Sequence, residues 1–157
     1  MSEVAQAHVE YDPSHFAVLA AREADSFWFQ IRNDLIIWAL GRFFGSATRI
    51  LRLGVGTGFV MRAVRHAFPH AELWGSDLHI EGLRYAAERL KGDAALVQFD
   101  AQSMPFREQF DVVRAFDVIE HISDDARVLE EMHRILLVSR TRGSQHNLLL
   151  VVDGDGP

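Results

Sequence analysis

The chain has 157 residues, of which 48% are hydrophobic and 24% are charged, and a formal net charge of −6. This length suits one globular domain, the absence of cysteine excludes disulfides and thiolate nucleophiles, and the acidic balance argues against a nucleic-acid partner. With no apolar run of membrane-spanning length and no export signal in residues 1–12, we expect a cytoplasmic protein without a membrane partner.

Residues 14–44 come before the first predicted strand. Apolar side chains at Trp28, Ile31, Leu35 and Trp38 recur at the three- and four-residue spacing of an amphipathic helix, which Gly45 is expected to end. We therefore expect residues 1–45 to form a helical leader or cap and residues 46–157 to form the main ligand-binding domain, the two making one compact unit.

The rest of the chain alternates between strand and helix patterns. Short apolar runs predict strands at 49–53, 71–76, 94–99, 110–116 and 147–152. Helical spacing marks 60–68, 83–90 and 128–136, and Ser123 is the expected N-cap of the last of these. This alternation predicts an α/β, Rossmann-like, doubly wound and mostly parallel sheet, which binds ligands beyond the carboxyl ends of its strands.

Three glycines, Gly54, Gly56 and Gly58, follow the first predicted strand in the stretch "GVGTG". Glycines at this turn let a ligand approach the main chain, although the pattern also fits a plain strand-to-helix turn. Asp77 ends the second strand 21 positions after Gly56, close to the offset at which a carboxylate meets a ribose, and a simple turn aspartate is the alternative. The spacing differs from the dinucleotide fingerprint G-x-G-x-x-G, and no P-loop is present.

The order of four segments resembles the class I S-adenosylmethionine-dependent methyltransferases that act on small molecules. The segments are "ILRLGVGTG", "LWGSDLHIEGLRYAAER", "VQFDAQSMPF" and "FDVVRAFDVIEHISDDARVLEEMHRIL". The resemblance covers about residues 47–137 and implies S-adenosyl-L-methionine as the cofactor. It implies that the three glycines line the amino-acid portion of the cofactor and that Asp77 accepts both ribose hydroxyls.

Further site residues follow from the same resemblance. Leu78 is expected against the adenine, Asp100 at the adenine amino group with the Ala101 amide beside it, and the Phe116 backbone near the methionine portion. For Asp100, a solvated turn carboxylate is the alternative.

The leader also resembles the helical segment that closes over the cofactor in many bacterial members of this family. Arg32 is the candidate partner of the cofactor carboxylate, whereas Trp28 and Phe29 fit either a cover or a buried aromatic stripe. His121 is the candidate general base, because it follows the fourth strand and imidazole titrates near neutral pH; a purely structural role for His121 is the alternative. The histidines show no metal-ligand spacing, so no metal is predicted.

Two departures from the family pattern stand out. Arg52 occupies a position that is usually acidic in the family. The family sheet has seven strands, whereas we predict five, so the chain resembles a C-terminally truncated member that lacks the last two. The run 147–152 is then expected at an exposed edge, an arrangement compatible with a homodimer.

The leading interpretation is a methyltransferase that moves a methyl group from S-adenosylmethionine to a small-molecule acceptor. Two alternatives are kept: a non-catalytic S-adenosylmethionine-binding module, which Arg52 and the missing strands favour, and an NAD-dependent oxidoreductase, which the glycine spacing disfavours.

Overall fold

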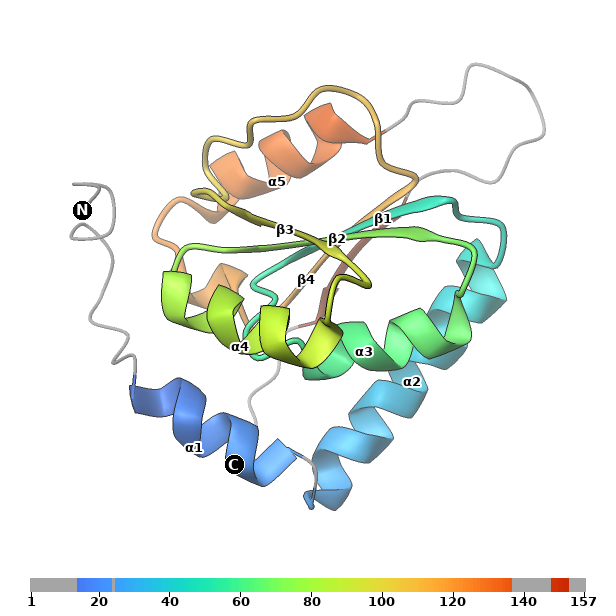
Figure 1. Ribbon diagram of the computed structural model, residues 1–157. Helices are drawn as coiled ribbons and strands as arrows, with labels where there is room; N and C mark the ends of the chain where they lie inside the picture. The colour runs from blue at the N-terminus through green and yellow to red at the C-terminus, as the bar shows by residue number, and fades with distance from the viewer. Residues whose placement is uncertain (1–13, 24, 137–147, 153–157) are drawn as a thin grey trace.

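The computed structural model describes residues 14–23, 25–136 and 148–152, and its centre is a five-stranded parallel sheet (Figure 1). The strands are β1 (Arg49–Leu53), β2 (Glu72–Asp77), β3 (Ala95–Gln98), β4 (Val112–Phe116) and β5 (Leu148–Val152). Their spatial order is β3-β2-β1-β4-β5, and every neighbouring pair is parallel. The chain runs outward from β1 to β3 and then returns to β4, so the predicted doubly wound α/β sheet is confirmed.

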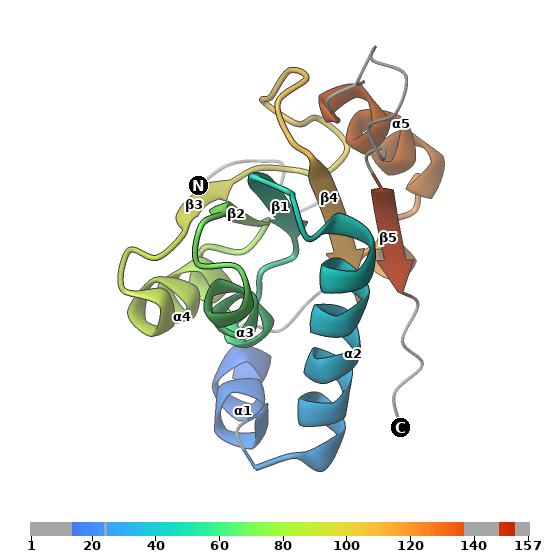
Figure 2. The same ribbon diagram turned by 90° about the vertical axis from the view of Figure 1, so that its right-hand side faces the viewer.

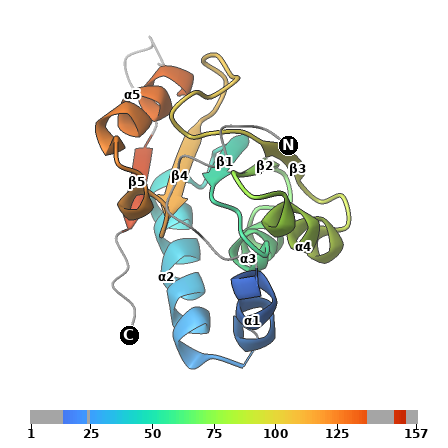
Figure 3. The ribbon, with the colours of Figure 1, turned by 90° about the vertical axis from the view of Figure 1, so that its left-hand side faces the viewer.

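Helices cover both faces of this sheet (Figures 1 and 2). The helices α2 (Phe27–Phe44), α3 (Phe59–Ala67) and α4 (Ile80–Leu90) lie on one face, and α5 (Asp125–Ile135) lies on the other. The helix α1 (Ser14–Glu23) packs against α4 on the first of these sides (Figure 3). Neighbouring residues of β1 face opposite cores, Ile50 with α2 and α3 and Leu51 with α5, which explains why apolar residues occupy consecutive positions in this strand.

The leader is two helices, and the apolar residues whose spacing predicts a helix lie on an exposed face of α2. Trp28, Ile31, Leu35 and Trp38 are 44–60% exposed, whereas Asn33, Ile36 and Leu40 are buried. Apolar residues lie on two faces of this helix, so their spacing predicts a helix correctly but does not decide which face meets the sheet. Gly45 is the C-cap, as predicted.

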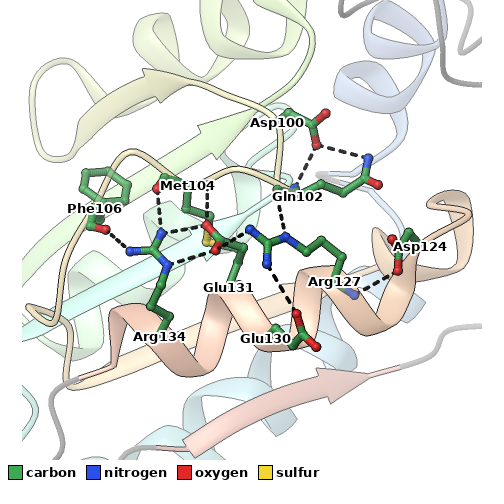
Figure 4. Close-up of polar contacts among 9 residues, drawn as sticks. All are labelled: Asp100, Gln102, Met104, Phe106, Asp124, Arg127, Glu130, Glu131 and Arg134. Carbon is green, nitrogen blue, oxygen red and sulfur yellow. Dashed lines mark hydrogen bonds and ion pairs between the residues drawn. The ribbon is translucent and has the colours of Figure 1, made fainter.

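A carboxylate on α5 ties this helix to the loop that follows β3 (Figure 4). Glu131 is buried and accepts hydrogen bonds from the Met104 amide at 2.8 Å and from Arg134 at 2.6 Å, and Arg127 lies 3.1 Å from its other oxygen. The N-cap of α5 is Asp124, whose side chain accepts from the Arg127 amide; the expected cap, Ser123, was one residue too early. These contacts hold the loop 100–106 against α5.

Candidate functional site

A cavity of about 1120 Å³ opens at the carboxyl ends of β1, β2 and β4, the end at which doubly wound sheets bind ligands. Of the ten residues expected at the site, nine line it and Gly58 does not. The nine are Arg32, Gly54, Gly56, Asp77, Leu78, Asp100, Ala101, Phe116 and His121. The topology therefore brings together residues that are separated by up to 89 positions in the sequence.

The three glycines of the loop after β1 have three different reasons to be glycine. All have positive φ angles: 60° at Gly54, 54° at Gly56 and 77° at Gly58. A Cβ atom on Gly54 would collide with Val118, and one on Gly58 would come within 3.0 Å of the backbone of α4 at Ala86. A Cβ atom on Gly56 would meet nothing within 4 Å, so this is the glycine that keeps the cavity open.

Asp77 joins the glycine loop to the end of β2. One carboxylate oxygen accepts the Gly56 amide at 2.9 Å, and the other accepts the His79 amide at 3.0 Å. Each oxygen has two lone pairs, so both keep an acceptor site after these bonds are made. The residue is 8% exposed yet lines the cavity, which makes its carboxylate a pre-oriented acceptor for a hydroxyl-bearing ligand.

The segment after β3 supplies a second carboxylate and an apolar wall. Asp100 accepts the amide of Gln102 at 2.8 Å, which orients its side chain. Leu78 and Phe99 line the cavity beside it, so a flat apolar group could pack here with a carboxylate at its edge. Phe99 was not among the expected residues, although it lies directly before Asp100 in the third motif.

The end of β4 carries an ion pair that the sequence does not reveal. Asp117, which has a positive φ of 52°, accepts Arg32 of α2 at 2.5 Å, and both line the cavity. The guanidinium expected to meet a ligand carboxylate is therefore already paired with a protein carboxylate. His121 lies at the rim on the short 3-10 helix η2 (Ile119–His121), with its side chain 66% exposed.

The helix α1 forms a wall of the cavity and is held by a buried polar cluster. Glu23 of α1 accepts the Thr57 hydroxyl at 2.7 Å and pairs with Arg89 of α4, also at 2.7 Å. The same Arg89 nitrogen lies 3.1 Å from the Thr57 carbonyl oxygen. Because Thr57 belongs to the glycine loop, these contacts fasten α1 to the loop and to α4 at once; we call Glu23, Thr57 and Arg89 the α1 latch.

Within the part of the chain that the structure describes, no group of three or more metal-ligating side chains occurs. None of the helices in the same part is long and apolar enough to cross a membrane.

Comparison with known proteins gives consistent matches. The sequence model of a methyltransferase domain matches residues 51–138. The demethylmenaquinone methyltransferase of Thermotoga maritima is 36% identical over 89 residues, which cover 56% of this chain and 38% of that protein. The malonyl-[acyl-carrier protein] O-methyltransferase of Legionella pneumophila is 35% identical over 94 residues, 58% of this chain and 33% of its own length.

A solved structure of the phosphoethanolamine N-methyltransferase 2 of Haemonchus contortus in complex with S-adenosyl-L-methionine superposes with a TM-score of 0.59. It is 31% identical over 68% of this chain and 25% of that one. The chain thus matches 33–38% of the length of the two curated relatives and a quarter of this structure.

Proposed function

This chain belongs to the methyltransferase-domain family, and from that premise we propose that its cavity binds S-adenosyl-L-methionine and that the domain transfers the methyl group to a small-molecule acceptor. The observation that carries the proposal is the convergence of nine expected cofactor and catalytic residues on one cavity at the carboxyl end of the sheet.

The residues present fit this cofactor. Gly56 leaves open space where any other residue would place a side chain, so a ligand can lie against the main chain of the loop. Asp77 keeps an acceptor site on each oxygen, which suits two neighbouring ribose hydroxyls. A cavity of about 1120 Å³ also has room for an acceptor molecule beside a nucleoside.

The other proposed cofactor-binding roles belong mostly to residues that line the cavity. With the cofactor bound, Leu78 and Phe99 would pack against the adenine, Asp100 would accept a hydrogen bond from its amino group, and the Ala101 amide would lie beside it; all four residues line the cavity. Gly54, Gly56 and the backbone of Phe116, which also line the cavity, would hold the amino-acid portion. Gly58 has an indirect role: it lets the N-terminus of α3 pack on α4 and so shapes the loop.

When bound, the cofactor supplies an electrophilic methyl carbon on a sulfonium. The protein has to hold the acceptor in line with that carbon and exclude water, and such positioning contributes roughly 7–11 kcal/mol to barrier reduction in well-oriented reactions. His121, at the rim of the cavity, is placed to remove a proton from an acceptor hydroxyl or amine. The relatives named for demethylmenaquinone and for a malonyl group on acyl-carrier protein support acceptors of small-molecule type.

Isothermal titration calorimetry and a turnover assay test the proposal. We expect S-adenosylmethionine and S-adenosylhomocysteine to bind and NAD not to bind. We also expect S-adenosylhomocysteine to form when pooled small-molecule acceptors are added. Binding of NAD alone would refute the cofactor assignment. Tight cofactor binding without turnover would instead support the non-catalytic module.

A further inference from the structure

Two buried arginines lie side by side on adjacent strands of the sheet. Arg52 of β1 and Arg114 of β4 are register partners on adjacent strands, 6% and 0% exposed. Their guanidinium carbons lie 5.8 and 5.5 Å from the centre of the Phe116 ring, so both side chains converge on the same side of the sheet. Two buried positive charges next to each other are costly unless an anion compensates them.

Within the described residues, the protein itself does not supply that anion. Arg52 donates from Nε to the Gly54 carbonyl at 3.2 Å, and its buried Nη1 has no hydrogen-bond partner. Arg114 has only the Met61 sulfur at 3.7 Å, and its Nε and Nη1 have no partner. Burial, together with the nearby Arg32, lowers the pKa of Arg52 to about 10. Burial, followed by the charge of Arg52, lowers the pKa of Arg114 well below its ordinary value.

The carboxylates that act electrostatically on Arg52 are Asp117, Asp77 and Glu23, and each has other partners. Asp117 is paired with Arg32, Asp77 accepts two backbone amides, and Glu23 belongs to the α1 latch. None of the three forms an ion pair with Arg52. Arg52 lines the cavity and Arg114 does not, so Arg52 is the member of this pair that can contact a ligand.

We infer that Arg52 is a carboxylate-binding residue, which holds the carboxylate at the amino-acid end of the bound cofactor beneath the glycine loop. The inference rests on the proposed function, because the Gly54 carbonyl that anchors Arg52 belongs to the loop assigned to that end of the ligand. A guanidinium here attracts a carboxylate and repels an ammonium, so the chain recognises the ligand by its negative rather than its positive group.

A series of three ligands tests this inference on the full chain by titration calorimetry. The first is S-adenosylhomocysteine. The second is its decarboxylated analogue, which keeps the amine. The third is its deaminated analogue, which keeps the carboxylate. We expect the deaminated analogue to bind within about threefold of S-adenosylhomocysteine and the decarboxylated one to bind at least about tenfold more weakly, the range of a hydrogen bond to a charged group.

The variant Arg52→Met, which removes the charge but keeps a long side chain, is expected to bring the carboxylated and decarboxylated ligands to nearly equal affinity. Arg49→Met is the matched control and is expected to keep the difference, since Arg49 lies on the same strand outside the cavity and is paired with Glu72. Arg32→Met tests the competing assignment and is expected to keep the difference because Arg32 is paired with Asp117. Thermal melts of all three variants check folding, and the ligand ranking of the wild-type protein is measured without any variant.

Three results would overturn the inference. Equal weakening by loss of either group would show that Arg52 does not select for the carboxylate. Collapse of the difference in Arg32→Met, and not in Arg52→Met, would move the role to Arg32. Failure of all three ligands to bind, together with 5′-methylthioadenosine, would refute the proposed function itself, whereas the first two results would leave that function standing.

Discussion

At the residue scale, the three glycines of the loop after β1 serve two different purposes: two are needed for packing and one leaves space for a ligand. Gly54 and Gly58 face protein atoms, whereas Gly56 faces open space in the cavity. All three have positive φ, so any substitution carries some backbone strain. Only at Gly56 does the added side chain enter the space that we assign to the ligand.

Gly56→Ala is therefore expected to lower S-adenosylhomocysteine affinity by at least about tenfold, while strain costs about 1–2 kcal/mol of stability. The control is Gly92→Ala, because Gly92 also has a positive φ, of 93°, with open space around it but does not line the cavity. Titration calorimetry and thermal melts compare the two. Equal loss of affinity in both variants would show that strain, and not the cavity, is responsible.

Asp77→Ala is expected to weaken S-adenosylhomocysteine binding by about 10–100-fold, since it removes a charged acceptor for the ribose hydroxyls. It also removes the acceptors of two backbone amides, so a lower melting temperature is expected as well. Asp93→Ala, at an exposed position outside the cavity, is the control. A folded Asp77→Ala protein with unchanged affinity would exclude Asp77 from the ribose role.

At the scale of elements, α5 holds the loop after β3 through one carboxylate, Glu131. Hydrogen bonds from Arg134 and from the Met104 amide lower the pKa of Glu131 from 4.5 to about 2, against the opposing effect of burial. A lowered carboxylate pKa in the folded state means stability that is complete above pH 4.5. That stability is lost as the pH falls from about 4.5 towards 2.

We expect Glu131→Gln to lower the free energy of unfolding by about 1.5–3 kcal/mol at pH 7, and by less at pH 3, where the wild-type protein has lost part of the same contribution. Urea unfolding at both pH values measures this. Glu130→Gln is the matched control on the same helix, because Glu130 is 71% exposed and meets only Arg127 at 3.3 Å. A Glu131→Gln deficit that is independent of pH would contradict the expectation.

Most elements are predictable from the sequence, and the exceptions have physical reasons. The strand β1 was predicted at its exact bounds because an apolar run ends in a glycine, which marks the turn. The bounds of β2 were predicted one residue early, because Ala71 is apolar and buried although it lies just before the strand. For α2 the helix was predicted but its buried face was not, since two of its faces are apolar and only the sheet decides between them.

At the scale of the whole molecule, the family resemblance named most of the expected residues that line the cavity. Asp100 and Phe116 were expected from that resemblance and Asp77 also from its place at the end of the second strand; the three lie together because the carboxyl ends of parallel strands meet at one edge. The α1 latch was not predictable in this way. Its members are 32 to 66 residues apart, and nothing in their spacing marks Glu23 as buried.

Thr57→Val removes the hydroxyl at the centre of the latch and leaves Glu23 and Arg89 a poorer set of hydrogen bonds. We expect faster amide hydrogen exchange in residues 14–23, with exchange in β1 and β4 unchanged. Thr48→Val is the control, since its hydroxyl bonds Asp111 on the surface, 2.8 Å away, and not α1. Unchanged protection of residues 14–23 would show that apolar packing alone holds the helix.

The latch also has a kinetic consequence. Because α1 forms one wall of the cavity, a bound molecule is partly enclosed by a helix that is held in place by polar contacts. We therefore expect the residence time of the molecule to depend on opening of this helix as well as on contacts inside the cavity. A substitution at Thr57 is expected to shorten the residence time and to speed turnover that is limited by product release.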